Sequence, residues 1–188
     1  MKITVMSSTD EQYDAAVRTC RAIFLQKTRD YGTSWRVLRT ISIADQLYIK
    51  ARRIRTLQEA GSGKVGEDKA GEFRAMVNYG VIGLIQLSIE PGAAEELTVD
   101  EACSYYDDKV ALARETMTAK NHDYGEAWRE MSQESFADLI LMKLLRIRQI
   151  VANDGKTLVS EGIDSNYIDI INYSLFALIL IDEGKHTQ

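Results

Sequence analysis

Charged side chains interrupt a segment of the chain that is otherwise apolar. The sequence LILMKLLRIRQI at residues 139–150 would be apolar on nearly every side of a helix. At about 100° per residue, Lys143 and Arg146 share one edge of that helix with Asp138. Buried charges are costly unless they meet a partner or a ligand. We therefore expect this edge to contribute to a site for a phosphate-bearing ligand, with Lys143 and Arg146 on the phosphate.

A second polar face follows in residues 161–173. Asp169 lies three residues before Asn172 and four before Tyr173, so the three side chains share one face of a helix. We expect Asn172 and Tyr173 to orient the ligand. Carboxylate oxygens also bind Mg²⁺ or a sugar hydroxyl, and the segment contains three of them as candidate ligands: Glu161, Asp164 and Asp169.

The sequence KNHDYGEAWR, which begins at Lys120, combines aromatic rings with cations. In a nucleotide site, Tyr124 or Trp128 would stack on the base. Lys120 and Arg129 would reach phosphate, and Asp123 would lie beside them. In a structural alternative the segment ends a helix, with Asp123 in the turn. Trp128 then packs in the core, and this interpretation is favoured because large aromatic side chains usually lie there.

The polar groups also fit a purely structural explanation. Asp169 would pair with Arg146 or Lys143, and Asn172 would cap a backbone carbonyl. The protein would then be a structural or oligomerising one with an internal ion-pair network. Residues 174–181 are then a candidate dimer face of a homo-oligomer, although a place in the core is favoured for them. The sequence leaves both explanations open.

An internal duplication organises the chain. The sequences KTRDYGTSWR, from Lys27, and KNHDYGEAWR, from Lys120, are identical at six of ten positions and lie 93 residues apart. The same offset pairs Lys50 with Lys143, and an offset of 94 then pairs Asn78 with Asn172. We therefore divide the chain into a first repeat (residues 10–87), a linker (88–99) and a second repeat (100–183).

The two repeats differ in their acidic residues. Ala75 stands where the second repeat has Asp169, and Ala70 stands where it has Asp164. The second repeat thus carries the fuller set of candidate metal ligands. We expect a ligand site there and a weaker copy in the first repeat.

Each repeat is predicted to form three helices. One proline and twelve glycines in 188 residues favour long helices over a β fold. Three such helices cannot enclose a core alone, so the repeats should pack about a pseudo-twofold axis into one all-α helical bundle. The expected helices are residues 11–27, 42–58 and 67–89, then 100–120, 135–152 and 164–182.

Composition excludes several classes of protein. A net charge of -5 and a pI near 5.2 argue against binding to duplex nucleic acid. The longest apolar run, residues 173–181, is too short to span a membrane, and residues 1–8 do not resemble a signal peptide. Two cysteines without a metal-ligand spacing favour the cytoplasm. The expected partner is a small-molecule nucleotide.

Four motifs together resemble the nucleotide modification associated domain 1 family: KNHDYGEAWR, DLILMKLLRIRQI, GKTLVSEGID and DIINY. The resemblance is strongest over residues 120–177, and residues 27–85 form a weaker copy. It implies an association with free or modified nucleotides, without an established reaction.

The chain is more distantly similar to the MazG-type all-α nucleoside triphosphate pyrophosphatases. That similarity implies an alternative function, the Mg²⁺-dependent hydrolysis of a triphosphate to monophosphate and pyrophosphate. Glu161 and Asp164 match the ExxD spacing of those enzymes, whereas Asp138 stands alone where they have an acidic cluster.

Overall fold

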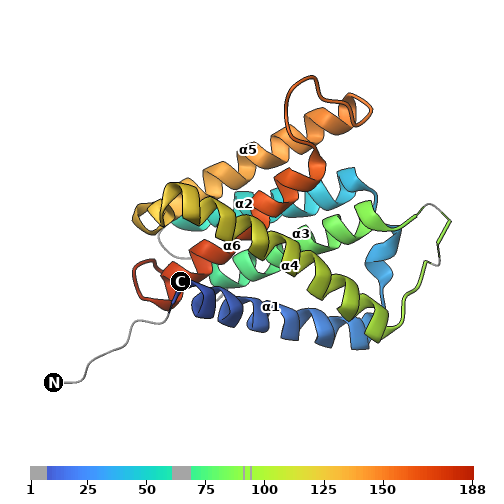
Figure 1. Cartoon of the computed structure of the whole chain (residues 1–188), viewed down its shortest axis with the longest axis horizontal. Coiled ribbons are helices and arrows are strands. Elements are labelled where there is room, and N and C mark those ends of the chain that lie inside the picture. Colours follow the sequence, from blue (N-terminus) through green and yellow to red (C-terminus); the bar gives the residue numbers. More distant parts are fainter. Residues whose placement is uncertain (1–7, 61–68, 91, 94) are drawn as a thin grey trace.

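The computed structural model describes residues 8–60, 69–90, 92–93 and 95–188. Within these ranges the chain forms six α-helices and two short 3-10 helices, and no strand (Figure 1). The predicted all-α fold is confirmed. In chain order the elements are α1 (Thr9–Tyr31), η1 (Ser34–Val37), α2 (Thr40–Ala60), α3 (Lys69–Ser88), α4 (Val99–Tyr124), η2 (Ala127–Glu130), α5 (Gln133–Ala152) and α6 (Ile163–Asp182).

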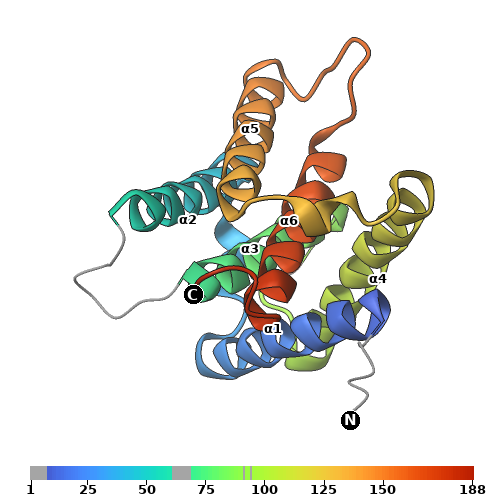
Figure 2. The ribbon, with the colours of Figure 1, turned by 90° about the vertical axis from the view of Figure 1, so that its left-hand side faces the viewer.

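The helices pack as three antiparallel or crossing pairs, each with one helix from each repeat. α3 and α6 form the central pair, with α2 and α5 on one side and α1 and α4 on the other (Figure 2). α3 also packs on α2, and α6 also packs on α5, so each central helix contacts helices of both repeats. The repeats therefore interlock in the pseudo-symmetric bundle that the duplication predicts.

α6 is apolar nearly all round because other helices enclose it. From Asn166 to Ile181 every residue except Tyr173 is buried. Over the described residues, none of the helices combines the length and hydropathy needed to cross a bilayer. The apolar character of α6 is thus explained by its place at the centre of the bundle.

Two glycines of α3 allow α6 to approach closely. A Cβ on Gly83 would lie 2.6 Å from Cζ of the Tyr167 ring, and one on Gly80 would lie 2.7 Å from Cγ1 of Ile171. Neither distance leaves room for a methyl group. The absence of a side chain at these two positions sets the spacing of the central helix pair.

We predict that Gly83→Ala destabilises the protein by about 1–3 kcal/mol, because the rigid Tyr167 ring must move to admit the methyl group. Helix propensity alone would give the opposite sign, a gain of about 1 kcal/mol. Urea denaturation decides between them, and a more stable variant would contradict the close contact. In a Tyr167→Leu background the same substitution should cost less.

Hydrogen bonds that cross between the repeats obey the pseudo-twofold symmetry. The Tyr13 hydroxyl donates to Oδ1 of Asn172 at 2.8 Å, and its counterpart Tyr106 donates to Oδ1 of Asn78 at 2.7 Å. All four side chains are buried. Burial raises the pKa of both tyrosines well above the ordinary value, so each hydroxyl keeps the proton that it donates.

Ion pairs at the edge of the bundle repeat the same symmetry. Arg21 lies 2.6 Å from Asp107 through its Nε, and the equivalent Arg114 lies 2.8 Å from Asp14. These pairs join α1 to α4, once in each direction. Because they are partly exposed to solvent, they fix the register of the two helices more than they add stability.

The first helix of each repeat is longer than predicted. α1 and α4 continue through the Asp-Tyr pair to Tyr31 and Tyr124, instead of ending at the preceding lysine. Gly125 stops α4 with a positive φ of 63°, a conformation that glycine adopts without strain. Thr98 is the N-cap of α4 and forms a capping box with Glu101. The predicted start of the third helix at residue 67 and the linker residue Pro91 lie outside the described residues.

Candidate functional site

Asp169 is held between two lysines in the second repeat. Its Oδ1 lies 2.6 Å from Nζ of Lys120, and its Oδ2 lies 2.6 Å from Nζ of Lys143. Lys143 and Asp169 are buried, whereas half of the Lys120 side chain is exposed. Burial lowers the pKa of Lys120, but the hydrogen bond and the charge of Asp169 outweigh it, so the pKa is raised. The structure thus brings together three of the predicted site residues as an internal ion pair.

The rest of the predicted charged edge of α5 faces outward. Asp138 and Arg146 are exposed, and Asp138 lies 3.8 Å from Arg55 on α2. The reciprocal pair, Arg148 with Asp45, has a separation of 2.7 Å. Of the three residues, Lys143 alone lies on the buried face of α5. Asp138 and Arg146 lie on the exposed face.

The Asn172 amide uses both its oxygen and its nitrogen in hydrogen bonds within the core. It accepts the Tyr13 hydrogen bond and donates to the backbone carbonyl of Ala113 at 3.0 Å. This matches the predicted carbonyl contact of the structural alternative. Tyr173 is only half-buried and packs at an angle against Phe136, with 6.2 Å between the ring centres.

The rings of the second Asp-Tyr-Gly segment have separate environments. Trp128 is 6% exposed and stacks on Phe176 with 4.2 Å between the ring centres. It lies in the core, as the structural interpretation predicts. Tyr124 is 77% exposed at the end of α4, and Asp123 beside it is exposed as well.

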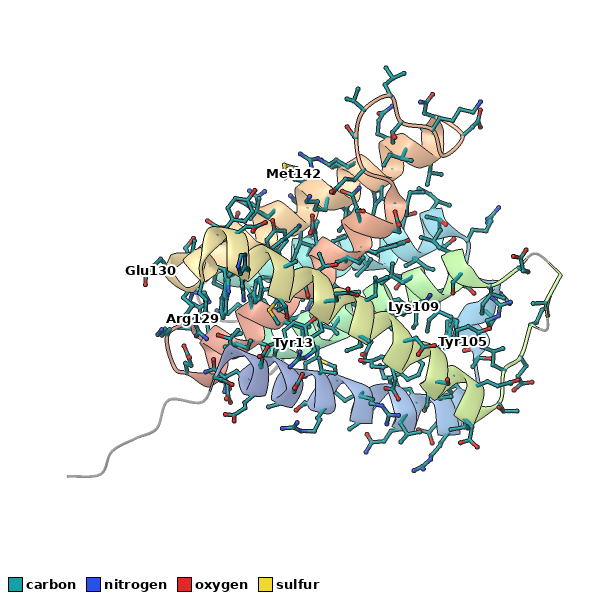
Figure 3. The ribbon with its side chains drawn as sticks, in the orientation of Figure 1. Tyr13, Tyr105, Lys109, Arg129, Glu130 and Met142 are labelled. Carbon is teal, nitrogen blue, oxygen red and sulfur yellow. The ribbon has the colours of Figure 1, made fainter. Side chains whose placement is uncertain are left out.

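Arg129 connects the second repeat to the first turns of α1 and to the residue that follows α6. It lies 2.8 Å from Glu126 and 3.0 Å from Glu183, and its guanidinium covers the Trp128 ring at 4.4 Å. Figure 3 places it at the end of the bundle where α1 begins and the chain ends. The two donors of its Nη2 are used in hydrogen bonds to Thr9 and Gln12. These contacts account for Arg129 without a ligand.

The predicted magnesium ligands do not form a cluster. Glu161 and Asp164 are exposed, and Asp169 is already paired with two ammonium groups. Among the residues that the structure describes, no group of three or more His, Cys, Asp or Glu side chains is placed to hold a metal ion. The donor set of the described residues therefore does not fit Mg²⁺.

The second repeat has a cavity of about 670 Å³ where α5 ends and the chain leads into α6. Its polar lining includes Arg146, Lys156, Glu161 and Asn166. Two of the predicted residues, Arg146 and Glu161, thus face the same space. The cavity contains charges of both signs and no aromatic ring among its lining residues.

The first repeat has a cavity of about 550 Å³ at the end of α1, beneath η1 and against α2 and α3. Three cations line it: Lys27, Lys50 and Arg74. No aspartate or glutamate is among its described lining residues. The remaining wall is mainly aromatic and aliphatic and includes Phe24, Tyr31, Trp35, Leu38, Tyr79 and Ile82.

The cavity opens in the first repeat because smaller side chains replace larger ones. Ala75 takes the position of Asp169, and Ile82 takes that of Phe176, the ring that stacks on Trp128. Trp35, the counterpart of Trp128, is accordingly only partly buried, and it makes a tilted contact of 6.4 Å with the ring of Phe24. The positions that the Phe176 ring and the Asp169 carboxylate fill in the second repeat thus carry smaller side chains beside the cavity of the first.

The charges around this cavity are unbalanced. Of the three lining cations, Lys50 has an ion pair, at 3.5 Å from Glu72. Glu72 also lies 3.2 Å from Arg53. Lys27 and Arg74 make no ion pair with any residue that the structure describes. The Lys50 ammonium also lies 5.8 Å from the centre of the Tyr79 ring. An excess of positive charge beside aromatic rings favours an anionic ligand with a flat apolar part.

Arg74 has no place in the site predicted from the sequence. The signal that would have found it is its isolation, because no acidic residue lies three or four positions away on its helix. Lys27 and Lys50 were visible only as the counterparts of Lys120 and Lys143. Their different environment depends on the missing acid at position 75.

A family model matches both repeats. The model described as nucleotide modification associated domain 1 matches residues 27–87 and 120–181, about two thirds of the chain. Neither the curated proteins nor the solved structures give a significant match. The two matched segments include the lysines and the Asp-Tyr-Gly segment of each repeat. The chain therefore belongs to the nucleotide modification associated domain 1 family.

Proposed function

We propose that the protein binds a small free or modified nucleotide in the cavity of the first repeat. The phosphate faces Lys27, Lys50 and Arg74, and the base lies against the wall that contains Tyr31 and Trp35. The observation that carries the proposal is a cavity lined by three cations, several aromatic rings and no described carboxylate. The family name agrees with a nucleotide as the ligand.

The size and chemistry of the cavity both support this class of ligand. A volume of about 550 Å³ lies within the range of small-molecule and cofactor sites. Ammonium and guanidinium groups bind phosphate through charge-assisted hydrogen bonds, and aromatic faces stack on bases. The larger cavity of the second repeat lacks the aromatic wall and contains Glu161, so it is the weaker candidate.

MazG-like hydrolysis of a nucleoside triphosphate is the less supported alternative to nucleotide binding. Among the described residues, the carboxylates that would hold Mg²⁺ in such an enzyme are not gathered at one point. The proposed ligand is a small molecule rather than duplex nucleic acid, in line with the net charge of -5. The proposed location remains the cytoplasm.

The test is a thermal-shift and calorimetric titration of the whole chain with deoxynucleoside mono- and triphosphates. Binding to the folded state raises its stability by mass action. Each titration is made in EDTA and again with Mg²⁺. We expect a rise in melting temperature in both conditions. Lys27→Ala and Arg74→Ala should each weaken binding by about tenfold or more, the loss of one charge-assisted contact.

Arg146→Ala is the matched control, because it removes an exposed cation from the cavity of the second repeat. We expect it to leave the affinity unchanged. If Arg146→Ala weakens binding and Lys27→Ala does not, the ligand occupies the second repeat. If no nucleotide raises the melting temperature, the proposed function is wrong.

A further inference from the structure

The second repeat carries a bound anion of its own, the Asp169 carboxylate. Each of its oxygens lies 2.6 Å from one ammonium nitrogen, of Lys120 or of Lys143. The first repeat keeps both lysines, as Lys27 and Lys50, at the same offset. Ala75 stands where the carboxylate would be. The first repeat therefore has both lysines but no carboxylate between them, and Lys50 lies instead 3.5 Å from Glu72.

The two repeats are similar enough at this point for one to serve as a template for the other. One turn after Ala75, the Asn78 amide donates to the Cys20 carbonyl of α1 at 3.0 Å. One turn after Asp169, the Asn172 amide makes the same bond to the Ala113 carbonyl of α4, also at 3.0 Å. The helices that carry the lysine and the acid position thus have the same register in both repeats.

We infer that, in the first repeat, a phosphate group of the ligand takes the place that the Asp169 carboxylate occupies in the second. It is held by Lys27 and Lys50 above the methyl group of Ala75. This inference rests on the proposed function and names the anion subsite within it. The subsite needs no divalent cation, because Lys27, Lys50 and Arg74 supply the positive charge.

Two differences between the repeats suit a phosphate rather than a carboxylate. A phosphoryl group is larger than a carboxylate and carries more than one negative charge. The replacement of Asp169 by Ala75 and of Phe176 by Ile82 supplies the space. Arg74, which stands where the second repeat has Ile168, supplies a third cation to the lining. The additional charge comes from a residue type that binds phosphate with two donors at once.

The experiment places a carboxylate in the proposed subsite and measures phosphate binding in EDTA. The probe is inorganic phosphate, titrated against the full chain by calorimetry. In Ala75→Asp the new carboxylate should pair with Lys27 and Lys50, as Asp169 pairs with its lysines. Phosphate binding should then weaken by about tenfold or more. A folded Ala75→Asp protein that binds phosphate like the wild type would overturn the inference.

A matched pair of lysine variants keeps the test independent of whether Ala75→Asp folds. Lys27 is exposed, so Lys27→Ala should fold, and we expect it to weaken phosphate binding about tenfold. Lys120→Ala removes the equivalent lysine of the second repeat and should leave phosphate binding unchanged. Equal effects of the two variants, or binding that appears only with Mg²⁺, would also overturn the inference.

The outcome separates this inference from the proposed function. A deoxynucleotide that binds the wild type and Ala75→Asp equally leaves the function in place and removes the subsite. Phosphate that binds the wild type and not Ala75→Asp, while no nucleotide binds, confirms the subsite and removes the function. Loss of both nucleotide and phosphate binding in Ala75→Asp and in Lys27→Ala supports both.

Discussion

Replacing Asn172 with alanine should lower the free energy of unfolding by about 2–4 kcal/mol. The amide is buried, and it joins the Tyr13 hydroxyl of the first repeat to the Ala113 carbonyl of the second. Alanine removes both hydrogen bonds and leaves the hydroxyl without its acceptor in the core. Urea denaturation followed by circular dichroism measures the loss.

The pseudo-symmetry supplies two controls for this prediction. Asn78→Ala breaks the equivalent contacts with Tyr106 and Cys20, so it should cost a similar amount. Tyr13→Phe should cost about 1–2 kcal/mol in the wild type and much less in the Asn172→Ala background, where the hydroxyl has already lost its acceptor. An Asn172→Ala protein as stable as the wild type would contradict the buried hydrogen bonds.

The fold could be predicted because the sequence signals for its helices are local and are repeated in the two halves of the chain. All six α-helices that the structure describes were predicted from the sequence, and the 93-residue offset predicts how the repeats are related. The ends of α1 and α4 were placed too early. The Asp-Tyr pair continues the helix, and only the positive φ of the following glycine stops it.

The candidate site was harder to predict because its cavity depends on the sizes of side chains from three different helices. The angular arithmetic placed Lys143, Asp138 and Arg146 on one edge, whereas in the structure Lys143 is buried and the other two are exposed. Ala75 was interpreted as the loss of an acidic ligand. Beside Lys27 and Lys50, the same residue instead leaves a space between cations.

Lys143→Met should cost about 2–4 kcal/mol, because it removes a buried partner from the Asp169 carboxylate. Methionine fills a similar volume, so the loss reports on the charge more than on packing. Lys120 remains at 2.6 Å, which keeps the cost below that of a carboxylate with no partner at all. Thermal and urea denaturation at neutral pH measure the effect.

The equivalent substitution in the first repeat should cost less, and the difference tests how the two repeats use the same lysine. Lys50 lies 3.5 Å from Glu72, which also pairs with Arg53, so Lys50→Met leaves that carboxylate with a cation. In the Lys143→Met background, Asp169→Asn should restore part of the stability, because it removes the charge that has lost its partner. If Lys50→Met and Lys143→Met cost the same and Asp169→Asn restores nothing, Asp169 is not the anion that holds the two lysines of the second repeat.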